Sequence, residues 1–382
     1  MRFLFLSTLV LQTAVALTAL ASGQTQDRQL ALENGGTLDY VLQLPEDFDE
    51  AKAYPVLLAL PPGKQNRAMV DAGLNLYWAE QGLARSWVVV SPVAPGPSFY
   101  SGSEVHLPAL LDEVAKQVQV AGGRVHVAGP SNGGRSAFRF ALGHPDRTAS
   151  LLVLPGFPPT AEDEKRLINL LEMPVEFLVG GDDEAWVVAS QRAHDALKQL
   201  GHQQLKLRIF PGEGHSPKSV TSHMVFDSLD AAHELLMRAE KSRSEVADVL
   251  DAFHLAAAQA DGEAYFSHFA PGAVFLGTDP QERWTIPEFR AFAAPYFGEG
   301  RGWTYIPTAR HITLGPGGNS AWFDEALDNK SYGETRGTGV LRRLAGTWRI
   351  AQYSLSIPVP NELAADLVQR IRGSQPAKEG GK

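Results

Sequence analysis

The distribution of apolar residues divides the chain into two parts with different patterns. From Tyr54 to about Met237, short continuous apolar runs alternate with segments whose apolar residues recur at helical spacing. Runs that stay apolar at consecutive positions are typical of strands buried on both faces of a parallel sheet. The expected strands are Pro55–Leu60, Ser86–Ser91, Arg124–Ala128, Leu151–Leu154, Val175–Val179 and Leu205–Phe210, and the expected helices include Leu107–Val118, Arg135–Leu142 and Ala189–Leu200. This alternation predicts a three-layer α/β domain with a mostly parallel sheet.

The second part places helices before strands. A helix is expected from Ser244 to Ala260, then a short second helix, an apolar run at Ala273–Leu276 and an acidic, aromatic stretch. Four long strand-like runs follow, separated by glycine-rich turns: Gly302–Ile312, Asn319–Leu327, Tyr332–Leu344 and Gly346–Ile357. Helices followed by an antiparallel meander predict an α+β domain.

Length and local composition set the domain boundaries. A chain of 382 residues is long enough for two domains. The charged and small residues at Glu240–Ser244 predict the boundary between a first domain over 24–240 and a second over 244–360. Residues 361–382 are expected to form a C-terminal tail, with a short helix at Glu362–Arg372.

The first 21 residues have the pattern of a secretory signal. Arg2 supplies a positive charge, residues 3–20 are almost wholly apolar, and Ala19–Ala21 offers the small residues that a signal peptidase accepts. An uncleaved membrane anchor is the alternative, but Gln12 and three threonines weaken a marginal length. We therefore expect cleavage after about residue 21 and a soluble, exported protein with no stable membrane insertion.

Composition and charge exclude several classes of function. Lys and Arg total 34 against 43 for Asp and Glu, a net charge of -9 with no long basic run, so nucleic acid is not an expected partner. The absence of cysteine excludes a thiol nucleophile, cysteine-ligated zinc and a lipid anchor on cysteine. For an exported protein without cysteine, we expect a bacterial periplasm or medium, where disulfides are permitted but not required. No spacing of ligand residues indicates a metal site, and no cofactor is expected.

A candidate nucleophile lies in the first part. Gly129-Pro-Ser131-Asn-Gly133 directly follows the strand Arg124–Ala128 and precedes a helical run. This is the Gly-x-Ser-x-Gly nucleophile elbow in its strand-turn-helix context, where the glycines let the serine backbone adopt a strained turn. The pattern alone arises often by chance, and its placement gives it weight.

A serine hydroxyl needs a histidine base that a carboxylate orients, and in such hydrolases the order is serine, acid, histidine. The strand Val175–Val179 ends in Gly-Gly-Asp182-Asp183-Glu184, and the strand Leu205–Phe210 ends in a glycine-flanked loop with His215. We expect the triad Ser131, Asp183 and His215, with Asp182 as the alternative acid. His126, inside a strand, is expected to be packed or hydrogen-bonded instead.

The oxyanion hole departs from the common pattern. One donor is expected to be the backbone N–H of Asn132, which follows the nucleophile. The second normally comes from a loop after an early strand, and here that loop reads Leu60-Pro61-Pro62-Gly63-Lys64. Proline has no N–H, so Gly63 or Lys64 is the expected donor.

At these residues the first part resembles the α/β-hydrolase superfamily. Pro55–Leu60, Gly129–Gly133, Gly180–Asp183 and Gly212–His215 fall where its third strand, elbow, acid and histidine lie. The chain is similar to the small capless esterases, polyhydroxybutyrate-depolymerase-like or dienelactone-hydrolase-like, because between Leu154 and Pro174 there is room for one helix only. The resemblance implies a carboxylic-ester hydrolase that works through an acyl-enzyme on Ser131.

The second part resembles the SnoaL-like, nuclear-transport-factor-2-like (NTF2-like) fold, in Leu276–Trp284, Glu288–Phe289, Pro295–Phe297 and Trp348–Tyr353. The resemblance implies a curved cone with an internal pocket, used for dimerisation, ligand binding or catalysis. Asp279, Glu282, Arg283, Trp284, Glu325 and Arg336 are candidates to line it. An Asp279–Arg283 ion pair that caps the next helix is the alternative, and Phe253, Phe266, Phe269 and Trp322 are expected in the core.

The expected function is an exported serine esterase that acts on a small or polymer-derived ester, with an accessory cone domain and a possible homodimer through that domain. Two alternatives remain open. One is a noncatalytic binding protein, which the altered Pro61-Pro62 loop favours. The other is an isomerase or dehydratase activity in the cone, which would survive loss of Ser131.

Overall fold

The computed structural model describes residues 24–374, so the predicted signal segment 1–21 lies outside the described residues. The chain divides into two compact units between Glu234 and Leu235. This division lies within the helix α7 (Ser222–Ala258). A helix that starts at Ser244 was expected, and that start is wrong because Glu240–Ser244 contains neither glycine nor proline and its residues are compatible with a helix.

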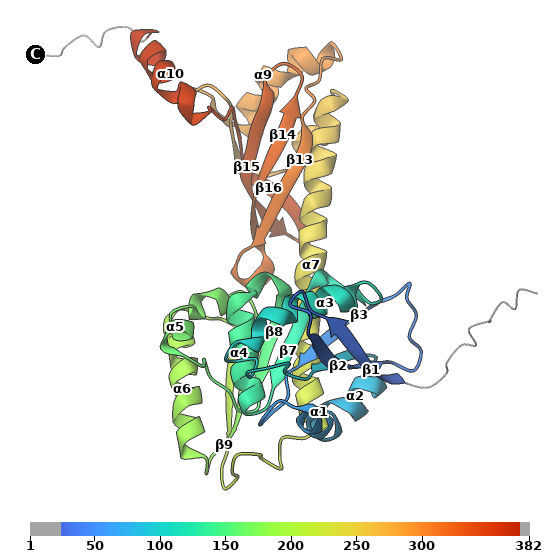
Figure 1. Ribbon diagram of the computed structural model, residues 1–382. Coiled ribbons are helices and arrows are strands. Elements are labelled where there is room, and N and C mark those ends of the chain that lie inside the picture. The colour runs from blue at the N-terminus through green and yellow to red at the C-terminus, as the bar shows by residue number, and fades with distance from the viewer. Residues whose placement is uncertain (1–23, 375–382) are drawn as a thin grey trace, which may run out of the picture. The chain divides into compact units, whose positions relative to one another are not determined.

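The first unit is built on an eight-stranded sheet in the order β1-β2-β5-β4-β7-β8-β9-β10 (Figure 1). Its strands are β1 (Gln24–Ala31), β2 (Thr37–Leu44), β4 (Val56–Ala59), β5 (Val88–Pro92), β7 (Val125–Gly129), β8 (Thr148–Val153), β9 (Val175–Gly180) and β10 (Leu205–Phe210). The short strands β3 (Ala53–Tyr54) and β6 (Gln119–Val120) pair with each other. β1 and β2 pair antiparallel, as do β2 and β5, and the other neighbours in the large sheet are parallel. The prediction of a mostly parallel sheet is confirmed.

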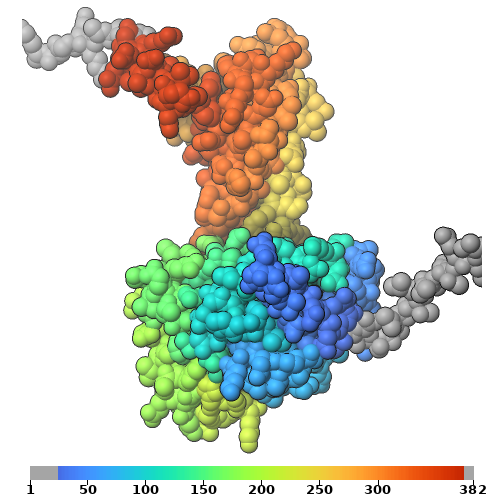
Figure 2. Space-filling view, in the orientation of Figure 1, coloured from blue at the N-terminus to red at the C-terminus, as the bar shows by residue number. Residues whose placement is uncertain are grey.

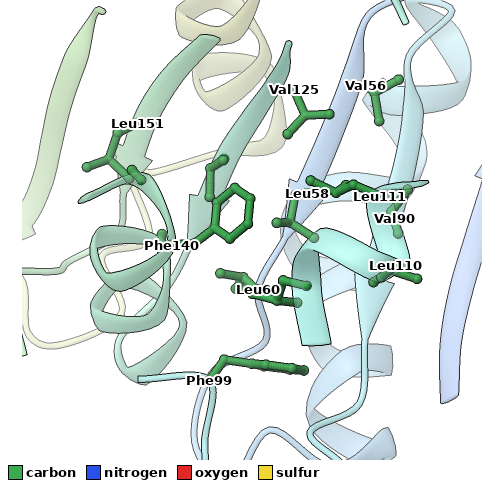
Figure 3. Close-up of a cluster of buried hydrophobic side chains, with 14 of the residues drawn as sticks. Val56, Leu58, Leu60, Val90, Phe99, Leu110, Leu111, Val125, Phe140 and Leu151 are labelled. Atoms are coloured by element: carbon green, nitrogen blue, oxygen red, sulfur yellow. The ribbon is translucent and has the colours of Figure 1, made fainter. Parts of the chain in front are cut away.

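The helices of the first unit connect these strands. They are α1 (Arg67–Gly73), α2 (Ala79–Ala84), α3 (Leu107–Ala115), α4 (Asn132–Gly143), α5 (Ala161–Glu164), α6 (Glu184–Gln199) and the first part of α7. Apolar side chains cover both faces of the sheet. On β4, Val56 and Leu58 join one buried cluster (Figure 3), whereas Leu57 and Ala59 join a second. Burial on both faces explains why these strands are continuously apolar in sequence.

The order of the strands creates a switch point at β4. β4 pairs with β5 on one side and with β7 on the other, and the later strands β8, β9 and β10 extend the sheet beyond β7. Connections at the carboxyl ends of β4 and β7 therefore leave the sheet in opposite directions and leave room between them for a site.

The second unit contains a six-stranded sheet in the order β12-β11-β16-β15-β14-β13. Its strands are β11 (Phe269–Leu276), β12 (Arg283–Thr285), β13 (Ile306–Leu314), β14 (Ser320–Asn329), β15 (Gly333–Leu344) and β16 (Thr347–Ser356), and its helices are the last part of α7, α8 (Gly262–Ser267), α9 (Ile286–Gly298) and α10 (Asn361–Ser374). Apart from the parallel pair of β11 and β16, the strands pair antiparallel. The predicted α+β order is confirmed, and the residues of this unit run from yellow through orange to red in Figure 2.

Alternation along β14 separates the two faces of this sheet. Ala321, Phe323 and Leu327 are buried, whereas Trp322 is 49% exposed. The expectation that Trp322 belongs to the core is therefore wrong, because side chains next to each other in a strand point to opposite faces. Phe253 and Phe266 do belong to the core, as does Phe269. Within residues 24–374, none of the helices has the length and apolar character needed to cross a membrane.

Candidate functional site

Ser131 lies in a strained turn between β7 and α4. Its φ of 58° and ψ of -120° fall in a region that residues with a Cβ rarely adopt. The turn is held by the Ser131 N–H, which donates to the Pro155 carbonyl at 3.0 Å. A Cβ on Gly133 would lie 2.1 Å from the Leu60 oxygen, and one on Gly129 would lie 2.4 Å from the carbonyl carbon of Gly133. The glycines of the motif therefore permit the close approach that the elbow requires.

The three residues of the predicted triad lie within hydrogen-bonding distance. His215 Nε2 is 2.8 Å from Ser131 Oγ, and His215 Nδ1 is 2.5 Å from Asp183 Oδ2. Asp183 directly precedes α6 at the carboxyl end of β9, and His215 follows β10. Asp182, the alternative acid, is exposed. Asp183, and not Asp182, is therefore bonded to His215. In this arrangement a histidine base contacts the serine and a carboxylate orients the histidine, as the activation of a serine requires.

The loops that carry Asp183 and His215 are tied to each other. The Asp182 N–H donates to the Glu213 carbonyl at 2.9 Å, and a Cβ on Gly180 would lie 1.9 Å from the Gly214 oxygen. The carboxylate of Glu213 accepts from the Ser219 N–H at 3.0 Å and from its hydroxyl. These bonds from Ser219 hold the pKa of Glu213 below its usual range. Glu213 therefore shapes the loop that presents His215.

The loop with the predicted second oxyanion donor lies beside the start of α4. Asn132 is the first residue of α4, where backbone N–H groups have no partner four residues earlier in the helix. Its side-chain Nδ2 donates to the Gly63 carbonyl at 3.0 Å. Gly63 has a φ of +57° and adopts the left-handed conformation that glycine tolerates. Both predicted donor residues are thus brought together next to Ser131.

A residue that sequence reasoning missed fixes this loop. Gln65 is fully buried and has a φ of 55°. Its Nε2 donates to the Pro61 carbonyl and to Ser136 Oγ, both at 2.9 Å, and its Oε1 accepts from the Phe99 N–H at 2.7 Å. A polar residue after Pro-Pro-Gly-Lys has no sequence signal for burial, because its partners are distant along the chain.

A cavity of about 260 Å³ opens beside Ser131. Its walls are mostly apolar and include Pro62, Met69, Ala72, Leu76, Tyr77 and Leu154, with Ser131 and His215 at one side. Trp186 also contacts His215, with ring centroids 4.8 Å apart and an interplanar angle of 66°. The His215 side chain is 41% exposed. The arrangement offers a short apolar pocket and an approach from solvent.

His126 is buried away from this chemistry, as expected. Its Nδ1 lies 2.7 Å from Ser150 Oγ, and its Nε2 lies 3.2 Å from His233 Nδ1. Burial, together with the charges of His233 and Arg124, lowers the pKa of His126 to about 3. The imidazole is therefore neutral at ordinary pH and takes part in packing.

The second unit holds a cavity of about 240 Å³. Most of its wall is aromatic: Phe253, Tyr265, Phe275, Trp284, Phe289, Phe292, Trp303, Tyr305, Tyr332 and Tyr353. Of the residues predicted to line a pocket, Glu282 and Trp284 do so. Arg336 is exposed on its strand, and Asp279 Oδ1 accepts from the Gln281 N–H at 2.9 Å. Phe253 is both a core residue and part of the cavity wall.

Glu325 lies behind the wall of this cavity and is fully buried. It accepts from His254 Nε2 at 2.7 Å and from the Tyr353 hydroxyl at 3.0 Å, and both of these residues line the cavity. Arg310 Nε donates to the other carboxylate oxygen at 2.8 Å. Burial raises the pKa of Glu325, but the bonds from His254 and Arg310 outweigh it and hold the pKa below its usual value. Sequence reasoning placed Glu325 on a strand without finding His254 as its partner.

Within residues 24–374 no group of three or more His, Asp or Glu side chains is placed to hold a metal ion.

Comparisons with known proteins agree with this division. Residues 246–360 match the family model of a SnoaL-like domain. A dipeptidyl-peptidase 5 from Porphyromonas gingivalis is 31% identical over 150 residues, which are 34% of this chain and 21% of that protein. The matched segment thus spans about a fifth of that relative's length.

Solved structures of two kinds also align with the chain. A feruloyl esterase module from Clostridium thermocellum aligns with a TM-score of 0.47 and 15% identity, over 56% of this chain and 88% of that chain. An S-formylglutathione hydrolase from Agrobacterium tumefaciens aligns with a TM-score of 0.46 and 17% identity, over 57% and 97%. An NTF2-like protein of unknown function from Pseudomonas putida gives a TM-score of 0.27 and 18% identity, over 31% and 88%.

The two units therefore belong to two different classes. The mostly parallel sheet and the strand-turn-helix at Ser131 give the first unit an α/β-hydrolase fold, in which Ser131, Asp183 and His215 follow one another in the chain and are hydrogen-bonded. The second unit contains a SnoaL-like, NTF2-like domain. Both resemblances drawn from the sequence are confirmed.

Proposed function

We propose that the protein is a serine esterase that cleaves carboxylic esters through an acyl-enzyme on Ser131. The observation that carries this proposal is the pair of hydrogen bonds at 2.8 and 2.5 Å that link Ser131 to His215 and His215 to Asp183. A serine outside a catalytic site has no need of a strained backbone, a histidine partner and a carboxylate behind it.

The reaction follows from this geometry. His215 Nε2 accepts the proton of Ser131 as Oγ attacks the ester carbonyl, and Asp183 stabilises the imidazolium that forms. The imidazolium then protonates the leaving alcohol. Water, activated by the same imidazole, attacks the acyl-enzyme and releases the carboxylic acid and free Ser131. The backbone N–H groups of Asn132 and of Gly63 or Lys64 are the proposed donors to the oxyanion.

The shape of the site favours a substrate with a short apolar acyl group. The cavity beside Ser131 has a volume of about 260 Å³, which suits a small group better than a long chain. Between β8 and β9 the chain forms only α5 and a short 3-10 helix (Leu167–Leu170), and His215 is partly exposed. These features support small or polymer-derived esters that approach an uncovered site.

Labelling with a fluorophosphonate tests the proposal. The full mature chain is expected to gain the mass of one adduct, and Ser131→Ala is expected to gain none, because the reagent reacts with activated serines. A series of p-nitrophenyl esters would then show the best turnover with short acyl chains. A well-folded wild-type chain that stays unlabelled would contradict the esterase proposal.

The aromatic cavity supports a binding role for the second unit, and the exposed Trp322 on the opposite sheet face supports a homodimer. Light scattering on the eluting full chain tests the dimer. Wild type is expected to have the mass of two chains, and Trp322→Asp the mass of one. A monomeric wild type at working concentration would refute it.

An isomerase or dehydratase activity in the cone is the second candidate function. It is favoured by His254, which lines the cavity and is oriented by the buried Glu325, an arrangement suited to proton transfer. Labelling that depends on Ser131 supports the esterase. An activity of the cone, or a noncatalytic binding role, would instead persist in Ser131→Ala. Export to a periplasm or medium remains a proposal from the sequence of residues 1–21.

A further inference from the structure

The cavity of the second unit combines aromatic walls with negative charge. Ten of its sixteen lining residues are Phe, Tyr or Trp. Apart from the tyrosines, its ionisable lining residues are Glu282 and His254, and neither Lys nor Arg lines this cavity in the described chain. An aromatic ring has a negative face, so these walls attract positive charge in addition to excluding water.

Two polar side chains of the wall, His254 and Tyr353, are bonded to Glu325. His254 Nε2 faces a carboxylate oxygen at 2.7 Å and therefore carries a proton, which in a neutral imidazole leaves Nδ1 as an acceptor. The Tyr353 hydroxyl donates to the same oxygen at 3.0 Å. Because both donors are directed to Glu325, a ligand in the cavity finds acceptors at these residues.

Three carboxylates and one guanidinium lie at the cavity or are bonded behind its wall. Arg310 bonds to Glu325 at 2.8 Å and to Asp251 at 2.7 Å, so one guanidinium lies between two carboxylates. Glu282, at the cavity itself, adds a further carboxylate. An anionic ligand in the cavity would lose its hydration without a lining Lys or Arg to pair with, and this desolvation has a high cost in free energy.

We propose that this cavity binds an organic ammonium ion, with its alkylated nitrogen against the aromatic faces and Glu282 as its counter-charge. The inference rests on the proposed binding role of the second unit and adds the class of ligand. Aromatic walls alone would also accept a neutral apolar molecule. The carboxylate and the absence of Lys and Arg among the lining residues select the cation.

Calorimetric titration of the full chain compares choline with 3,3-dimethylbutan-1-ol, its neutral analogue in which carbon replaces nitrogen. The two probes have nearly the same shape, so their difference in affinity reports the positive charge. We expect choline to bind at least about tenfold more tightly. Neutral 2-naphthol serves as a third probe, because it quenches nearby tryptophans and reports occupancy of the cavity without a charge.

Variants locate the binding. Glu282→Gln and Trp284→Leu are expected to weaken choline by about tenfold, and Glu282→Gln is expected to leave the neutral alcohol unchanged. The matched control for Glu282→Gln is Glu334→Gln, at an exposed position outside the cavity wall. It is expected to bind choline as wild type does, and circular dichroism confirms that each variant is folded.

The outcomes separate this inference from the binding role on which it rests. Equal affinity for choline and the alcohol, or binding of 2-naphthol without choline, would overturn the cationic class and leave the binding role intact. A folded chain that binds none of the three probes would overturn both. Because the comparison of probes uses the wild-type chain, it holds even if a variant fails to fold.

Discussion

At the scale of single residues, the buried amide of Gln65 connects the two halves of the proposed oxyanion hole. Gln65 donates to Ser136 Oγ, and Ser136 in turn donates to the Asn132 carbonyl at 2.9 Å. The loop with Gly63 is thereby joined to the first turn of α4. A donor that shifts by a fraction of an ångström loses much of its effect on a developing oxyanion, so Gln65 acts as a positioning residue.

Gln65→Ala is expected to lower kcat for p-nitrophenyl acetate by roughly 10- to 100-fold with little change in KM, because the oxyanion exists only in the transition state. Steady-state kinetics with separate kcat and KM measures this. Gln43→Ala is the matched control, a buried glutamine that bonds to the Ala79 carbonyl at 3.0 Å, and it is expected to lose stability but keep kcat. An equal fall of kcat in both variants would assign the effect to general destabilisation.

Asp183 and Asp182 differ by one position and by their relation to His215. Asp183→Asn is expected to reduce kcat about 10³- to 10⁴-fold, because the amide no longer stabilises the imidazolium in its correct tautomer. Asp182→Asn is expected to change kcat by less than about threefold, because its side chain is exposed and lies outside the bonded set. Parallel assays of the two variants decide which aspartate serves the histidine, and a larger loss in Asp182→Asn would contradict the assignment.

At the scale of elements, local patterns were predictable from the sequence and long-range neighbours were not. The elbow at Ser131 was found because its glycines and its strand-turn-helix context lie within about twelve residues. The antiparallel β1 and β2 were missed, since a single strand carries no sign of the direction of its partner. Likewise, the pairing of His254 with Glu325 joins α7 to β14 over a separation of 71 residues.

Helix α7 shows the limit of composition as a guide to boundaries. Its residues Val225, Phe226 and Leu229 are buried in the first unit, and Val246, Leu250 and Phe253 are buried in the second. The segment 240–244 was interpreted as a domain boundary because its residues are charged and small. A helix tolerates such a segment where its residues have good helical propensity and no proline breaks the backbone hydrogen bonds.

Helix α9 begins with a capping box, and this feature makes a prediction at the element scale. Thr285 N–H and Oγ1 donate to Glu288 Oε2 at 2.9 and 2.7 Å, which lowers the pKa of Glu288. Glu288→Ala is expected to lower the free energy of unfolding of the second unit, and Glu288→Gln to lower it by less, because an amide oxygen still accepts. Urea unfolding of the full chain, followed by circular dichroism, measures both. Equal losses would show that the cap contributes nothing beyond helix propensity.

At the scale of the whole molecule, the two units place two kinds of site in one chain: an exposed triad with a short apolar pocket, and an aromatic cavity in front of a buried carboxylate. Each site lies within its own unit. Activity of the triad and binding in the cavity are therefore separately measurable, by Ser131→Ala and by Glu282→Gln.

The stability of the first unit is expected to depend on pH through His126. Its folded pKa is about 3, against 6.5 in the unfolded chain, so between these values only the unfolded state binds the proton. The free energy of unfolding is constant above the unfolded pKa and falls as the pH decreases toward the folded one, by on the order of 5 kcal/mol in total. Urea midpoints measured across this range test the slope.

Variants at two histidines provide the comparison for this pH dependence. His126→Gln is expected to flatten the slope, since its side chain does not titrate. His223→Gln, at an exposed position of α7, is expected to keep it. A slope that persists unchanged in His126→Gln would assign the acid sensitivity to other groups.

The uncovered position of Ser131 and His215 also bears on what can take the acyl group away. In the proposed acyl-enzyme, the carbonyl would be open to any small nucleophile that diffuses in, since the connection between β8 and β9 provides only α5 and a short 3-10 helix. Methanol or an amine would then compete with water and leave as a new ester or amide. The residues that we propose to hydrolyse esters in dilute solution would thus transfer the acyl group to alcohols where these are abundant.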